Sequence, residues 1–240
     1  VVIGERGCGK SGLIREYAKY LDEKTPIFCL RTEDLDKPHL DQVFSAIGLT
    51  SSLGDLEAGM ALMPKKFLFI ESLEKLLELQ SGVAFRDLMY FSHHHPGWTI
   101  IASCREYGIQ QISFEFLQPS SVDYKLLPIT GFNDDEISYL CENLKILKPF
   151  ADNPSLKPLL KNPFFAELAY RVINNGKEFS KNDDEREFRS AVWRYVISKD
   201  YERANGMPLR RRNVFIDIAV KRAKQMVYEI SSTEFDADAV

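Results

Sequence analysis

The sequence contains few cysteines and no long apolar run. Its four cysteines (Cys8, Cys29, Cys104 and Cys141) lie far apart and form no Cys-x-x-Cys pair. This spacing argues against a disulfide framework or a zinc site and fits a reducing cytoplasm, where we expect the protein to reside. No apolar stretch approaches the ~20 residues that a membrane-spanning helix needs, and no signal peptide is visible. We therefore expect no membrane partner.

The sequence also lacks an excess of positive charge. Its formal net charge is −4, which argues against a nucleic acid as the main partner. Three consecutive arginines at 210–212 form a local basic patch and leave a nucleic-acid contact open as an alternative. With 45% hydrophobic and 28% charged residues, the 240-residue chain has the composition of an ordinary globular protein.

Short apolar runs alternate with helical patterns over the first 130 residues, which is typical of an α/β fold with a parallel sheet. The chain opens at Val1, without methionine, on residues that look like the end of a buried strand, so we expect it to be a piece of a longer protein. We expect strands at 1–3, 26–31, 67–70, 98–103 and 124–129, and helical segments after residue 10 and at 38–48, 53–62 and 72–92.

Beyond residue 130 the expected elements are helices. Asn133 with Glu136 three places later forms a capping-box pattern. Asn162 is placed as an N-cap, with Pro163 at the first helical position. The polar run 174–187 looks like a linker, and two more helices are expected at 188–200 and 208–229.

The segment "GERGCGKS" fits the pattern G-x-x-x-x-G-K-[ST] of a P-loop, with a strand before it and a helix after it. Glycines let backbone N–H groups surround phosphate oxygens, and the helix N-terminus adds partial positive charge. Lys10 would reach the outer phosphates and the Ser11 hydroxyl would ligate Mg²⁺. The alternative is a chance glycine-rich turn. The residues predicted to bind the nucleotide are Gly4, Glu5, Arg6, Gly7, Cys8, Gly9, Lys10, Ser11 and Gly12.

A P-loop needs an acid at the end of another buried strand. The stretch "FLFIE" predicts that Glu71 has this role and holds Mg²⁺ directly or through water. Glu74, three places later, is then a candidate for polarising the attacking water. Alternatively, both acids only occupy the start of a helix, where negative charge suits the helix dipole.

The strand "WTIIAS" is followed by Cys104 and Arg105. An arginine at this place can sense the terminal phosphate from the strand beside the acidic one. A surface-loop position for Arg105 is the alternative.

These segments, in this order, resemble the STAND class of P-loop NTPases, which includes the NACHT and NB-ARC ATPases. The residues from Glu71 to Lys75 look like the second acidic motif of that class, with two departures: Glu71 stands where Asp is usual, and Lys75 where a second acid is usual. "TIIASCR" is similar to its sensor strand, and "LKNPFFAEL" resembles the lid segment whose proline, Pro163, packs near the nucleotide.

The resemblance implies an ASCE-type P-loop fold, with a parallel sheet covered by helices on both faces. We expect the NTPase core at 1–130, a helical lid at 131–175, a linker at 176–187 and a helical segment at 188–240 that begins a winged-helix part. The expected cofactors are ATP or ADP and Mg²⁺.

In that class, the nucleotide state controls opening and oligomerisation, and hydrolysis is slow. The resemblance thus implies self-association, effector and sensor domains on the same longer chain, a protein trigger, a prokaryotic source and a role in defence. Two alternatives stay open: a constitutive AAA-type ATPase that acts as a motor or DNA-linked loader, and a scaffold that binds nucleotide without cleaving it.

Overall fold

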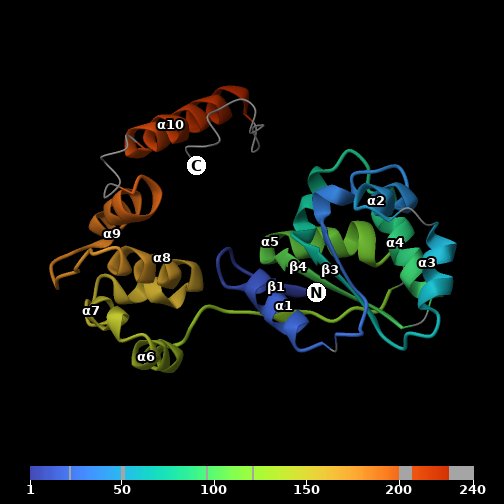
Figure 1. Cartoon of the computed structure of the whole chain (residues 1–240), viewed down its shortest axis with the longest axis horizontal. Helices are drawn as coiled ribbons and strands as arrows, with labels where there is room; N and C mark the ends of the chain where they lie inside the picture. The colour runs from blue at the N-terminus through green and yellow to red at the C-terminus, as the bar shows by residue number, and fades with distance from the viewer. Residues whose placement is uncertain (22, 50–51, 96, 121, 200–206, 227–240) are drawn as a thin grey trace. The chain divides into compact units, whose positions relative to one another are not determined.

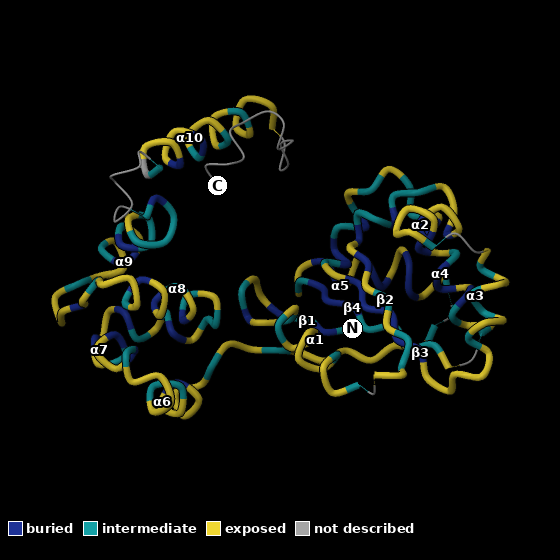
Figure 2. The backbone as a smooth tube through the Cα atoms, viewed as in Figure 1, coloured by how far each residue is buried: buried dark blue, intermediate teal, exposed yellow. Residues whose placement is uncertain are grey.

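The computed structural model describes residues 1–21, 23–49, 52–95, 97–120, 122–199 and 207–226. The chain divides into two units, Val1–Thr130 and Gly131–Val240 (Figure 1). Each unit has its own apolar core, and Figure 2 shows buried residues in both. None of the helices in these ranges is both long and apolar enough to span a membrane.

The first unit is a parallel five-stranded sheet in the order β2-β3-β4-β1-β5. The fold predicted from the sequence, a parallel sheet between helices, is confirmed. The strands are β1 (Val2–Gly4), β2 (Ile27–Arg31), β3 (Lys66–Glu71), β4 (Trp98–Arg105) and β5 (Leu127–Pro128).

Helices cover both faces of this sheet because its strands are apolar on both sides. On one face, α1 (Lys10–Lys19) packs Ile14 against Val2 and Phe69. On the other face, the strands pack against the remaining helices and the 3₁₀ and π segments of this unit. These are η1 (Thr32–Leu35), α2 (Leu40–Ala46), α3 (Leu53–Met60), η2 (Leu73–Glu78), α4 (Val83–His94), α5 (Glu106–Ile112) and η3 (Ser113–Leu117).

Two stretches of the first unit differ from the sequence-based expectation. The predicted helical region 72–92 is broken between η2 and α4, because the Ser81 N–H donates to Asp36 and Gly82 packs directly against Phe116. The helical stretch formed by α5 and η3 was not predicted at all. Its glycine, Gly108, interrupts the helical pattern of the sequence.

The second unit is helical. Its elements are α6 (Asp134–Asn143), η4 (Lys145–Leu147), α7 (Lys148–Ala151), η5 (Lys157–Lys161), α8 (Pro163–Asn174), α9 (Glu185–Val192), η6 (Trp193–Ile197) and α10 (Met207–Gln225).

Both helix starts predicted in this unit are confirmed. The Asn133 side chain accepts from the Glu136 N–H at 2.9 Å, and the Glu136 side chain accepts from the Asn133 N–H at 2.8 Å. Asn162 caps α8 by accepting from the Phe164 N–H at 3.0 Å, with Pro163 at the first helical position.

The stretch 176–187 is not the free linker that its polar composition indicated. Phe179 is buried between Phe150 and Phe188. The buried Asn153 amide donates to the carbonyl oxygens of Ser180 and Asp183, at 2.9 and 2.8 Å. This segment therefore joins the expected lid and the first part of the following helical segment in one core. The segment expected to begin a winged-helix part, 188–240, contains most of α9, η6 and α10 in its described residues 188–199 and 207–226. Its residues 200–206 and 227–240 lie outside the described ranges, and the winged-helix assignment stays a prediction.

Candidate nucleotide site at the carboxyl edge of the sheet

The loop between β1 and α1 depends on glycine. Gly7 and Gly9 have φ angles of 80° and 98°, in the left-handed region that other residues adopt at a cost. Gly9 is also the N-cap of α1. The chain therefore turns sharply from the buried strand into the first turn of the helix, where backbone N–H groups and the helix dipole favour an anion.

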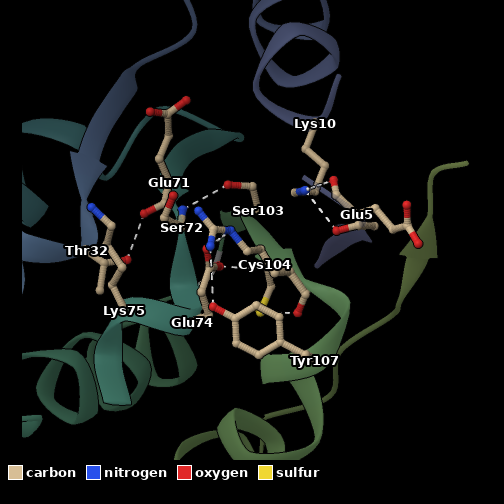
Figure 3. Close-up of polar contacts among 12 residues, drawn as sticks. Glu5, Lys10, Thr32, Glu71, Ser72, Glu74, Lys75, Ser103, Cys104 and Tyr107 are labelled. Atoms are coloured by element: carbon tan, nitrogen blue, oxygen red, sulfur yellow. Dashed lines mark hydrogen bonds and ion pairs between the residues drawn. The ribbon is translucent and has the colours of Figure 1, made fainter. Parts of the chain in front are cut away.

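The Lys10 ammonium lies over this loop. Its Nζ donates to the carbonyl oxygens of Gly4 at 2.9 Å and Glu5 at 2.7 Å (Figure 3). It also lies 3.8 Å from the Cys8 sulfur. The ammonium thus lies on the loop at the start of α1, as binding of the outer phosphates would require.

Cys8 and Gly4 pack the base of the loop. Cys8 is buried, and a Cβ on Gly4 would lie 2.8 Å from its sulfur and 2.4 Å from the Ile129 carbonyl oxygen. Glu5, Arg6 and Ser11 are exposed, so the Ser11 hydroxyl is accessible to a metal ion. A Cβ on Gly12 would meet nothing within 4 Å.

Glu71 ends β3 with its side chain exposed. Its backbone carbonyl accepts from the Thr32 hydroxyl at 2.8 Å. Ser72 follows with φ 61° and ψ 52°, and its N–H donates to the Ser103 hydroxyl oxygen at 2.9 Å. Figure 3 shows the Glu71 carboxylate directed away from Glu74, so the structure does not bring the two acids together.

Glu74 is buried, with only 4% of its side chain exposed. One carboxylate oxygen accepts from the Arg105 backbone N–H at 3.0 Å, and the other lies 3.1 Å from the Arg105 Nε. This two-point contact joins η2 to the end of β4. The sequence did not predict it, and it differs from the solvent-facing carboxylate expected of a group that polarises water.

Arg105 is 37% exposed and ends β4 beside the P-loop, because Gly4 and Arg105 are register partners in β1 and β4. Its guanidinium also contacts the Tyr107 hydroxyl at 3.5 Å. A pocket of about 610 Å³ lies between the loop and the start of α5, and the structure thus brings Arg105 and the P-loop to one cavity. Its lining residues are Glu5, Arg6, Arg105, Glu106, Tyr107 and Gln110.

Burial shapes the electrostatics of this edge. It raises the pKa of the Cys104 thiol to about 12, and the nearby Glu74 charge adds to the rise. Burial alone would also raise the pKa of Glu33, but the ion pair with Lys75 holds that pKa below its usual value. Cys104 is therefore a neutral thiol at physiological pH, while Glu33 neutralises the lysine found where a second acid was expected.

The sequence did not lead us to predict Thr32 and Glu33 as residues of this site. Both directly follow β2, so the rule that carboxyl ends of parallel strands share one edge could have indicated them.

The predicted oxygen donors suit Mg²⁺, a hard cation that favours hydroxyl and carboxylate ligands. Ser11 and Glu71 both present exposed oxygens at the carboxyl edge. Within the described ranges, no group of three or more His, Cys, Asp or Glu side chains is arranged to hold a metal ion by protein ligands alone. Pro163 lies in the second unit, so its contact with a nucleotide stays a prediction.

No family model and no curated protein sequence matches the chain. Among solved structures, it is similar to the Aeropyrum pernix ORC2 protein in its ADPNP–ADP complexes, with 13% identity and a TM-score of 0.54 over 80% of this chain and 60% of that one. The ADP form of the same protein matches with 13% identity and a TM-score of 0.53, over 82% and 63% of the two chains. A Walker-type ATPase of Pyrococcus abyssi matches over 88% and 70% at 14% identity, but its TM-score of 0.47 is too low to support an inference.

The chain spans about 60% of the length of the ORC2 structures. At such low identity the likeness shows the fold alone. The chain therefore has the P-loop NTPase fold of the ASCE type, followed by helical segments.

The packing at Gly4 can be tested by a matched pair of substitutions. Gly4→Ala should destabilise the chain by about 1–3 kcal/mol, because the new methyl group would overlap the carbonyl of Ile129, a residue whose own N–H is bonded to the Ile3 carbonyl oxygen. Gly12→Ala, in open space on α1, should be neutral or raise stability by up to about 1 kcal/mol. Chemical denaturation measures both, and equal effects would show that the loop does not have this conformation.

Proposed function

We propose that this chain binds ATP with Mg²⁺ and hydrolyses it slowly. The observation that best supports the proposal is the loop from Gly4 to Ser11, in which glycines with positive φ lead into α1 and the Lys10 ammonium lies over the turn. Few ligands other than a polyphosphate need backbone N–H groups, a helix N-terminus and a lysine at the same point.

In this proposal the loop N–H groups and Lys10 hold the phosphates. Lys10 exchanges its bonds to the neutral carbonyl oxygens of Gly4 and Glu5 for charged phosphate oxygens, and the charge-assisted bonds are the stronger ones. Ser11 and Glu71 would hold Mg²⁺, which would supply positive charge to neutralise the phosphates. Arg105, at the pocket beside the loop, contacts the terminal phosphate.

Slow hydrolysis is expected from Glu71. Its side chain is one methylene longer than the aspartate usual at this place, so the carboxylate holds Mg²⁺ farther from the backbone or through water. Because the exposed side chain lies at the end of its strand, directly before the left-handed Ser72, rather than in a packed site, its position is less restrained than catalysis favours.

For the biological task, we propose a STAND-type switch in which ADP keeps the module closed and ATP opens it for self-association. The spacing of Glu71 and Glu74 and the Asn162-Pro163 helix start favour this hypothesis. The likeness to ORC2 structures bound to ADPNP and ADP fits a constitutive AAA-type ATPase equally well.

The two hypotheses differ in turnover and assembly. A switch predicts ATP turnover well below about 1 s⁻¹, together with an ATP-dependent increase in mass by light scattering once the trigger is present. Rapid turnover by the chain alone, without a change in mass, favours the constitutive ATPase, as does salt-sensitive DNA binding.

Lys10→Ala tests nucleotide binding. We expect Mg-ATP affinity, measured by calorimetry, to fall about 100-fold or more, because a charged group at the phosphates is lost while the apolar core is untouched. Lys19→Ala removes an exposed lysine from the same helix and should leave the affinity unchanged. Unchanged binding by folded Lys10→Ala would exclude the site.

Glu71→Gln separates binding from hydrolysis. The variant should bind Mg-ATP with affinity within about fivefold of the original chain and lose about 100-fold or more in turnover, since the amide is a poor metal ligand. Glu78→Gln, on an exposed acid at the end of η2, is the matched control and should turn over ATP normally. Normal turnover by Glu71→Gln would remove Glu71 from the metal site.

A further inference from the structure

We propose that Glu74 is a positioning residue for Arg105 and not the group that polarises the attacking water. This inference rests on the proposed ATPase function. It assigns to Glu74 the task of holding the Arg105 guanidinium at the pocket beside the P-loop, where Arg105 contacts the terminal phosphate of the nucleotide.

The first support is the environment of Glu74. A water-polarising carboxylate must offer an oxygen to a water molecule, whereas Glu74 is 4% exposed and both of its oxygens contact Arg105. One oxygen accepts from the backbone N–H at 3.0 Å and the other pairs with Nε at 3.1 Å. A contact with both the backbone and the side chain of one residue restricts the position and the direction of that residue.

The second support is how the local chain builds this contact. The left-handed Ser72, tied to Ser103, turns the chain at the end of β3. The buried Leu73 and Leu76 then anchor η2 in the core on either side of Glu74. As a result, the acid lies beneath the end of β4 and away from Glu71.

Gly108 completes the arrangement. It lies in α5, which begins directly after Arg105, and a Cβ at this position would be 2.8 Å from the Glu74 Cβ. The close approach of α5 to η2 therefore requires glycine here. This packing connects the position of Glu74 to that of the helix that borders the pocket.

The third support is the part of the Arg105 guanidinium that does not contact Glu74. Glu74 holds the Nε edge, and the side chain as a whole is 37% exposed at a pocket lined by Glu5 and Tyr107. An arginine fixed by one edge presents its terminal nitrogen atoms with little further loss of side-chain entropy. Phosphate oxygens are the acceptors that suit this planar fork.

The test is a double-mutant cycle on the 240-residue chain with Glu74→Gln and Arg105→Gln, the latter keeping a hydrogen-bond donor for Glu74. Calorimetry measures affinities for Mg-ATP and Mg-ADP, and steady-state kinetics give kcat, KM and the pH profile. Each single variant should lose about 10-fold in ATP affinity relative to ADP. Because Glu74 acts through Arg105, the double variant should lose no more than Arg105→Gln alone.

Two further substitutions separate positioning from folding. Gly108→Ala shifts Glu74 without changing any charge and should lower the ATP-to-ADP preference in the same direction. Glu78→Gln should change nothing. Thermal unfolding confirms that each variant is folded, and Glu74→Asp, a shorter acid, should retain part of the preference if Glu74→Gln proves unstable.

Opposite results would overturn the inference. If Glu74→Gln lowers kcat about 100-fold in the Arg105→Gln background as well, and removes the acid limb of the pH profile, Glu74 acts on the reacting water itself. An unchanged ATP-to-ADP preference in folded Glu74→Gln also contradicts it. Failure of the original chain to bind nucleotide would overturn the proposed function together with this inference, whereas binding with additive effects overturns the inference alone.

Discussion

The register of the parallel strands determines where the phosphate-binding loop, Glu71 and Arg105 lie. Gly4 and Arg105 are partners across β1 and β4, and Ile70 is the partner of Ala102 across β3 and β4. Since parallel strands are joined by crossovers, their carboxyl ends meet at one edge of the sheet. The position of β4 between the other two places Arg105 between the phosphate-binding loop and Glu71.

Two acids three residues apart illustrate how strongly local geometry can separate neighbours in sequence. Glu71 is exposed at the end of its strand, whereas Glu74 is buried against Arg105. The left-handed Ser72 lies between them and turns the chain at the end of β3, and its N–H donates to the Ser103 hydroxyl oxygen. Two acids that look alike in the sequence therefore differ in the structure: Glu71 is suited to bind a metal ion, and Glu74 is suited to hold an arginine.

Features determined by short stretches of sequence were predicted well. The strands, the P-loop and the caps at Asn133 and Asn162 depend on residues within a few positions of each other, and the structure contains them all. Contacts between distant residues were not predictable. Glu74 and Arg105 lie 31 positions apart, and the pairing of Lys75 with Glu33 spans 42.

The other differences between the sequence-based predictions and the structure also arise from contacts between distant residues. Phe179 lies in a polar stretch, and only the core formed by Phe150 and Phe188 explains why that stretch is packed. The break before α4 likewise depends on Asp36 and Phe116, which are far from it in sequence. Periodicity and composition describe segments one at a time, so they do not reveal what a segment will pack against.

Hydrogen exchange of the backbone amides tests the central claim most directly, because the proposed site binds phosphate through its N–H groups. The account predicts that Mg²⁺ and a non-hydrolysable ATP analogue slow exchange at residues 5–11, with a smaller effect at 71–75, and that Lys10→Ala abolishes both changes. Nucleotide binding that slows exchange elsewhere and leaves residues 5–11 unchanged would contradict it.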